Sequence, residues 1–178
     1  MHARLQKEPD NLAAQRLSAH VLAARGEFAE ATQGLRKIAE DGRASTEDLN
    51  SFAWSALFLP SVPSDAVEAA ERGNTITQNQ QFPILHTLAC LYAETGKTVE
   101  ARNLLIKALD SSRIGEPNSA LWYGFGRLAE LYGQYDAALD DYKRVETPEI
   151  DDAFATYNLT QHRVQALKAK GSTLSAAN

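Results

Sequence analysis

The sequence predicts an all-α protein built as a stack of antiparallel helix hairpins, an α-solenoid. A short turn motif recurs at intervals of 35, 35 and 37 residues, closing at Ala31, Ala66, Ala101 and Ala138. On both sides of each turn, apolar residues recur at steps of three and four, the spacing of one α-helical face. Ten Gly and six Pro among 178 residues leave long stretches without helix breakers. A fixed period of this length indicates a repeat array.

Each period supplies two helices and a turn. Gly26, Gly96 and Gly133 provide a backbone position that is strained for other residues, so the second helix can fold back on the first. The second hairpin has a Pro-bracketed turn instead, and the closing alanines allow close helix approach. We expect first helices at 11–25, 46–59, 81–95 and 118–132, second helices at 28–40, 63–73, 97–110 and 135–146, and a final helix at 151–169.

The period also divides the chain into units. In the final helix, Ala155, Leu159, Val164 and Leu167 form an apolar stripe, whereas Arg163 and its polar neighbours face water, as expected for a cap on an open stack. A start within a repeat suggests a piece of a longer protein. The expected units are 1–11 (end of a preceding repeat), 12–46 (repeat 1), 47–81 (repeat 2, degenerate), 82–118 (repeat 3), 119–150 (repeat 4), 151–170 (capping helix) and 171–178 (flexible tail).

Repeat 4 has the fullest motif, made up of Trp122, Phe125-Gly126, Gly133, Tyr135, Ala138, Tyr142 and Pro148. In this order and nearly this spacing, the repeats resemble the tetratricopeptide repeat (TPR) family. The resemblance implies a right-handed superhelical stack. Repeat 2 departs most from the family pattern, with Trp54 where a small residue is usual.

A second resemblance is more distant. Leu85–Leu109 with Glu116–Val145 is similar to the helical-repeat tail of larger bacterial proteins that carry a transglutaminase-like domain.

Composition excludes several classes of partner. A net charge of -5 gives no basic field for nucleic acid, so no nucleic-acid partner is expected. No apolar run of about 18 residues appears, so no membrane insertion is expected. The single cysteine cannot form an internal disulfide. The compartment stays open, with the cytoplasm as default, because a start in mid-repeat would hide any signal peptide of the parent protein.

Catalytic and metal-binding patterns are missing from the sequence. The four histidines are scattered without metal-ligand spacing, so we predict no metal, no cofactor and no enzymatic activity. Cys90 follows His86 by one helical turn, but a structural or groove-lining role is favoured because no third group is evident. Gly124-Phe125-Gly126 is interpreted as helix packing. The aromatic residues Trp122, Tyr132, Tyr135 and Tyr142 are interpreted as the core of repeat 4.

In such stacks the first helices line the concave side. A mixed polar and aromatic surface there suits an extended or helical peptide, with Tyr and Arg as typical anchors. The alternative is that these are ordinary solvated helix positions. We therefore predict a protein–protein interaction module that binds a peptide or partner on this face. The alternative function is a structural arm that packs against the rest of its own larger polypeptide or self-associates. The predicted groove residues are Arg16, His20, Ser51, Ser55, Phe58, His86, Cys90, Glu94, Tyr123, Arg127 and Glu130.

Overall fold

A computed structural model describes residues 11–176 of the chain, with side chains through 169. The predicted end of a preceding repeat therefore lies outside the described residues, except for Asn11, which caps the first described helix. The elements in that range are helical. They are α2 (Leu12–Ala24), α3 (Phe28–Glu40), α4 (Thr46–Ser55), the 3-10 turn η1 (Ala56–Phe58), α5 (Ser64–Ile76), α6 (Phe82–Glu94), α7 (Thr98–Ser112), α8 (Ser119–Leu131), α9 (Tyr135–Tyr142) and α10 (Thr156–Ala176).

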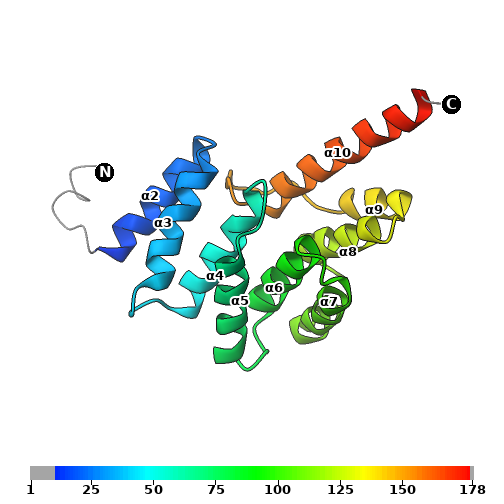
Figure 1. Cartoon of the computed structure of the whole chain (residues 1–178). Helices are drawn as coiled ribbons and strands as arrows, with labels where there is room; N and C mark the ends of the chain where they lie inside the picture. Colours follow the sequence, from blue (N-terminus) through cyan, green and yellow to red (C-terminus); the bar gives the residue numbers. More distant parts are fainter. Residues whose placement is uncertain (1–10, 177–178) are drawn as a thin grey trace.

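The helices pair into hairpins that stack in chain order (Figure 1). Helix α2 pairs with α3, α4 with α5, α6 with α7, and α8 with α9. Among the first helices, α4 contacts α6 and α6 contacts α8, while each second helix packs on the first helix of the next hairpin. The predicted all-α stack of antiparallel hairpins is confirmed.

The turn residues and closing alanines explain why each hairpin closes. Gly26, Gly96 and Gly133 have φ of 80°, 82° and 75°, and no heavy atom lies within 4 Å of a Cβ built on any of them. Glycine is therefore required by the backbone conformation and not by crowding. Each closing alanine is fully buried between its two helices. A larger side chain at these fully buried positions is expected to push the two helices apart.

Two glycines within α8 serve packing, as predicted. A Cβ on Gly126 would lie 2.6 Å from Cε1 of Tyr142, and one on Gly124 would lie 2.6 Å from Cδ2 of Leu105. Real Cβ atoms do not approach neighbours that closely, so these glycines let α9 and α7 pack tightly on α8.

Repeat 2 ends its first helix earlier than expected. Helix α4 stops at Ser55 and continues as η1 to Phe58 instead of running to residue 59. Leu59 is extended, with φ of -87° and ψ of 157°, because the ring of Pro60 disfavours helical geometry in the residue before it. Phe58, the last residue of η1, contacts the rings of Phe28 and Phe154.

The final helix also differs from its expected bounds. It begins at Thr156 and not at 151, and it continues through Ala176, so residues 171–176 are helical instead of the expected flexible tail. The late start has a local cause. Asp152 accepts the backbone N–H of Phe154 on Oδ1 at 2.9 Å and that of Ala155 on its carbonyl oxygen at 3.0 Å. This turn competes with helix formation.

The expected aromatic core of repeat 4 is correct in part. Tyr142 is buried, and Trp122 is half-buried beneath the guanidinium of Arg144, 4.4 Å from the ring centroid. Tyr132 and Tyr135 are 52% and 37% exposed, so the expectation is wrong for them. They flank the Gly133 turn at the tip of the hairpin.

Candidate peptide-binding groove

The inner side of the stack holds part of the same chain. After α9 the chain runs back toward α3 and α4 and then reverses into α10, which passes α8 and α9 (Figure 1). We call residues 147–155, between the two helices, the return segment. It is exposed from Thr147 to Asp152 and becomes buried at Phe154. A non-helical stretch of backbone thus lies against the repeats.

Phe154 fills an aromatic pocket in repeats 1 and 2, formed by His20, Phe28, Trp54 and Phe58. Its ring centroid lies 5.8 Å from that of His20, 5.9 Å from Phe28 and 5.3 Å from Phe58. The indole N–H of Trp54 donates to the carbonyl oxygen of Phe154 at 2.7 Å. The pocket therefore holds Phe154 through ring packing and through one hydrogen bond to its main chain.

Contacts within repeats 1 and 2 arrange the rings of this pocket independently of the return segment. Phe28 begins α3 directly after the Gly26 turn, and its ring stacks on Phe58 at 5.2 Å with an interplanar angle of 19°. Trp54 meets Phe58 edge-on at 6.3 Å, because η1 continues directly from α4. The rings support one another in the offset and edge arrangements that aromatic pairs prefer.

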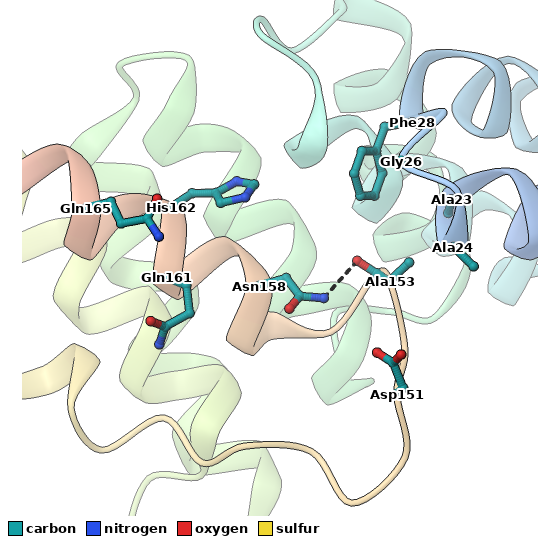
Figure 2. Close-up of a pocket in the computed structure, with 10 residues that line it drawn as sticks. All are labelled: Ala23, Ala24, Gly26, Phe28, Asp151, Ala153, Asn158, Gln161, His162 and Gln165. Atoms are coloured by element: carbon teal, nitrogen blue, oxygen red, sulfur yellow. Dashed lines mark hydrogen bonds between the residues drawn. The ribbon is translucent and has the colours of Figure 1, made fainter.

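A cleft of about 440 Å³ lies beside the pocket, between repeat 1 and the C-terminal part of the chain (Figure 2). One wall comes from the turn between α2 and α3, the other from the return segment and α10. Within the second wall, Asn158 donates from Nδ2 to the carbonyl oxygen of Ala153 at 3.2 Å. The return segment therefore covers repeat 1 incompletely. The lining residues are Ala23, Ala24, Gly26, Phe28, Asp151, Ala153, Asn158, Gln161, His162 and Gln165.

At the other end of the inner face, charged side chains hold α10. We call Glu94, Arg127, Glu130 and Arg163 the ionic cluster. Arg127 of α8 donates two hydrogen bonds to Glu94 of α6, the longer one 3.0 Å, and its Nη1 lies 3.5 Å from Oε2 of Glu130. Arg163 of α10 donates two hydrogen bonds to Glu130. Tyr142 adds a hydroxyl hydrogen bond to Glu130 at 2.9 Å.

The ionic cluster is electrically balanced. Burial opposes the charge of Arg127, but its hydrogen bonds to Glu94 raise its pKa above the ordinary value. Burial likewise opposes ionisation of Glu130, yet the hydrogen bonds of Arg163 and the charge of Arg127 hold its pKa below the ordinary value. Two carboxylates therefore face two guanidinium groups, and removing any one would leave a charge with little access to water.

His86 and Cys90 do not form a reactive pair. The His86 Nε2–H donates to the carbonyl oxygen of Ala120 at 2.8 Å, and Nε2 lies 3.5 Å from Cys90 Sγ. Burial lowers the pKa of His86 to about 4, and burial raises the pKa of the Cys90 thiol above its usual range. At neutral pH both side chains are uncharged, so Cys90 is not the thiolate that nucleophilic chemistry requires. Within 11–169, no cluster of three or more His, Cys, Asp or Glu side chains could hold a metal ion.

Arg16 has a structural partner. Its guanidinium donates to Asp48 through Nε at 2.7 Å and Nη2 at 2.9 Å, joining α2 to α4. Asp48 also forms a capping box with Ser45 at the start of α4. The hydrogen bonds from Arg16 lower the pKa of Asp48 to about 2. Arg16 therefore links the first two hairpins through a two-bond ion pair.

The eleven predicted groove residues separate into distinct environments. His20 and Phe58 meet in the aromatic pocket, Glu94, Arg127 and Glu130 meet in the ionic cluster, and Ser51 is half-buried on α4. Their use by a partner stays a prediction. The buried members, which present no open surface, are Ser55, His86, Cys90, Tyr123 and Arg127.

Sequence reasoning missed four residues of these two sites: Phe28, Trp54, Phe154 and Arg163. Arg163 was expected to face water but is half-buried on Glu130. Trp54 carried a usable signal, because a large residue stands where the TPR pattern has a small one. Phe154 carried none, since it lies outside the periodic apolar positions.

Comparisons with known proteins establish the fold. No protein-family profile matches the sequence, and no curated protein matches it. Among solved structures, a MamA mutant matches with a TM-score of 0.52 and 16% identity, covering 91% of this chain and 92% of that chain. A second MamA structure, from AMB-1, matches with a TM-score of 0.51 and 16% identity, covering 89% and 85%.

MamA is a TPR-like helical-repeat protein, and the match extends over nearly the whole of both chains. A parent protein with a transglutaminase-like domain is not shown by these matches. In the part of the chain that the structure covers, no helix is both long enough and apolar enough to cross a membrane. The chain has a TPR-type fold.

Proposed function

We propose that this chain is a protein-interaction module whose inner face binds a peptide segment of a partner protein. One observation carries the proposal: the aromatic pocket already holds a non-helical segment, through the ring of Phe154 and a hydrogen bond from Trp54 to its backbone. The TPR-type fold supports it, because helical-repeat stacks present extended concave surfaces to partners. The proposal assigns no reaction to the chain.

The composition of the pocket agrees with recognition of a protein. Aromatic residues contribute much of the binding energy at interfaces because they bury a large area at low conformational cost. His20 and Phe58 offer rings, and Trp54 adds a donor that reads any main-chain carbonyl. Such a pocket selects an aromatic side chain and tolerates variation in the residues around it.

Peptide selection tests the proposal directly. A displayed library of random peptides is selected on the immobilised full chain, and the recovered peptides are titrated against variants. Phe58→Ala and His20→Ala are expected to weaken binding by about tenfold, a loss near 1.4 kcal/mol. Val99→Ala, at an exposed position on α7, is the matched control and should bind as the wild type does. Peptides that are recovered but bind all variants equally would contradict a role for the pocket.

A second candidate is a structural arm that self-associates or packs on the remainder of a larger polypeptide. The observation in its favour is Leu17, which is 54% exposed on α2, the first helix that the structure describes. An exposed leucine on an outer repeat is typical of a surface that another repeat or a partner covers. Light scattering tests self-association: a dimer that Leu17→Lys abolishes supports the arm, and a monomer at all concentrations argues against it. The sequence of the full open reading frame tests whether the larger polypeptide carries a transglutaminase-like domain.

A further inference from the structure

We propose that the return segment is a tethered competitor for the aromatic pocket. The partner is accordingly a protein segment that presents a phenylalanine-sized ring on a tight turn, with the carbonyl of that residue free for Trp54. This inference rests on the proposed function and deepens it. It is carried by the fit of Phe154, by the self-contained turn that presents it, and by the cleft beside it.

The turn that carries Phe154 is built largely from its own residues. Asp152 accepts backbone N–H groups of Phe154 and Ala155, and Asn158 donates from Nδ2 to the carbonyl oxygens of Asp152 at 3.0 Å and Ala153 at 3.2 Å. Trp54 then joins this preformed unit to the repeats. A unit whose hydrogen bonds are mostly internal can leave the pocket without leaving many buried polar groups unpaired.

The chain on either side of the turn permits that movement. Residues 147–152 are exposed, including Ile150, which is 80% exposed. On the other side of the turn, the cleft of about 440 Å³ separates α10 from repeat 1. A partner segment can approach Phe28 through this cleft without separating any two repeats. The amide side chains of Gln161 and Gln165 line the approach and offer both donors and acceptors to a main chain.

Helix α10 stays in place while residues 152–155 are released. Leu159, in the first turn of α10, and Leu167 are buried in the core cluster that includes Tyr123 and Tyr142, and Arg163 is held by Glu130. The released turn therefore remains near its pocket, at a high effective concentration. A free partner binds only the fraction of molecules whose pocket is open, so its apparent affinity falls by that fraction.

The test uses a fluorescent peptide of residues 148–158 and the full chain. We expect Phe154→Ala to bind this peptide at least about tenfold more tightly than the wild type, because its own turn no longer competes. Ile150→Ala is the matched control: it alters an exposed residue of the same segment and should bind as weakly as the wild type. The same peptide with alanine in place of Phe154 should bind neither protein.

Two further measurements check that the variant folds and that Trp54 contributes to peptide binding. Circular dichroism checks that Phe154→Ala folds, and Phe154→Leu, which keeps an apolar side chain, replaces it if helicity is lost. Adding Trp54→Phe to the Phe154→Ala chain removes the indole donor and should weaken peptide binding about fivefold, the worth of one hydrogen bond.

Equal binding of the peptide to wild type and Phe154→Ala, or binding to neither, overturns the tethered competitor. If library peptides still bind through Phe58, the proposed function survives that failure; if they do not, both fail. A wild-type dimer that the peptide dissociates would mean that a second copy fills the pocket, which also overturns the proposal.

Discussion

The C-terminal part of the chain meets the inner face of the repeats in two chemically opposite ways. At repeats 1 and 2 it inserts one apolar ring into the aromatic pocket, next to a cleft. At repeats 3 and 4 it contributes Arg163 to the ionic cluster, and Leu159 and Leu167 to the core. The first contact is built like a binding site and the second like a structural joint.

The two contacts differ in the groups that lose their partners when each contact opens. Withdrawing Phe154 exposes rings to water, which costs about 1.5–3 kcal/mol for a buried apolar side chain. Breaking the ionic cluster leaves charges that are shielded from water, which costs about 3–5 kcal/mol for a buried pair. We call the contact of Phe154 with the aromatic pocket the aromatic end, and the contact of Arg163 with the ionic cluster the ionic end. The aromatic end should therefore open first, and the ionic end should determine the stability of the C-terminal half.

The largest effect is expected at the ionic end. Arg127→Ala leaves Glu94 and Glu130 without their shared cation and should lower the free energy of unfolding by about 3 kcal/mol or more. Urea denaturation measures the loss. Arg102→Ala, at an exposed position on α7, is the control and should change stability by less than about 0.5 kcal/mol. Equal losses in the two variants would show that the ionic cluster is not a structural joint.

His86 connects the two ends, since its ring lies 5.3 Å from that of Trp54 and its Nε2–H bonds to α8. Burial lowers its pKa from 6.5 to about 4, so between these pH values the unfolded chain binds the proton that the folded chain excludes. Stability should then fall by up to about 3 kcal/mol as pH drops from 6.5 to 4. His86→Gln should flatten this slope in urea titrations, and an unchanged slope would refute the assignment.

A smaller loss of stability is expected where α9 packs closely on α8, beside the ionic end. Gly126→Ala forces a Cβ against the ring of Tyr142, whose hydroxyl bonds to Glu130. We expect a loss of about 2 kcal/mol from overpacking. Gly42→Ala is the matched control, because nothing lies within 4 Å of its Cβ position. Similar melting temperatures for the two variants would mean that α8 and α9 can separate without cost.

The smallest effect on stability is expected at the aromatic end. Truncating a buried phenylalanine in an ordinary core costs about 3–5 kcal/mol. Phe154→Ala should cost only about 1.5 kcal/mol, because the loss cannot exceed the free energy that docks the return segment. Leu121→Ala, at a fully buried position on α8, gives the comparison and should cost at least about 2.7 kcal/mol. Losses of the same size in both would place Phe154 in the permanent core.

The repeats were predictable because their signals are local. The turn glycines, the closing alanines and the helical apolar steps lie within 35 or so residues of one another, and the structure has the hairpins where these features place them. The exceptions also have local causes in the sequence. Pro60 shortens α4, and the Asp152 turn delays α10.

The groove was less predictable because burial there depends on distant contacts. The period assigns His20, Ser55, Cys90 and Arg127 to equivalent positions, yet His20 is exposed and the other three are buried. Equivalent positions in the array differ because the C-terminal segment covers the repeats unevenly. The bond from Trp54 to Phe154 spans 100 residues, and no pattern in the sequence marks its acceptor.

Native-state hydrogen exchange tests most directly whether the return segment occupies a binding pocket reversibly. The indole N–H of Trp54, which bonds to the carbonyl oxygen of Phe154, reports on the aromatic pocket, and the amides of α6 report on the core. We predict that the indole N–H exchanges through an opening whose free energy is at least about 2 kcal/mol below that of α6, and that Phe154→Ala lowers it further. Protection of the indole N–H equal to that of α6 would show that Phe154 leaves the pocket only when the repeats unfold, which contradicts the account.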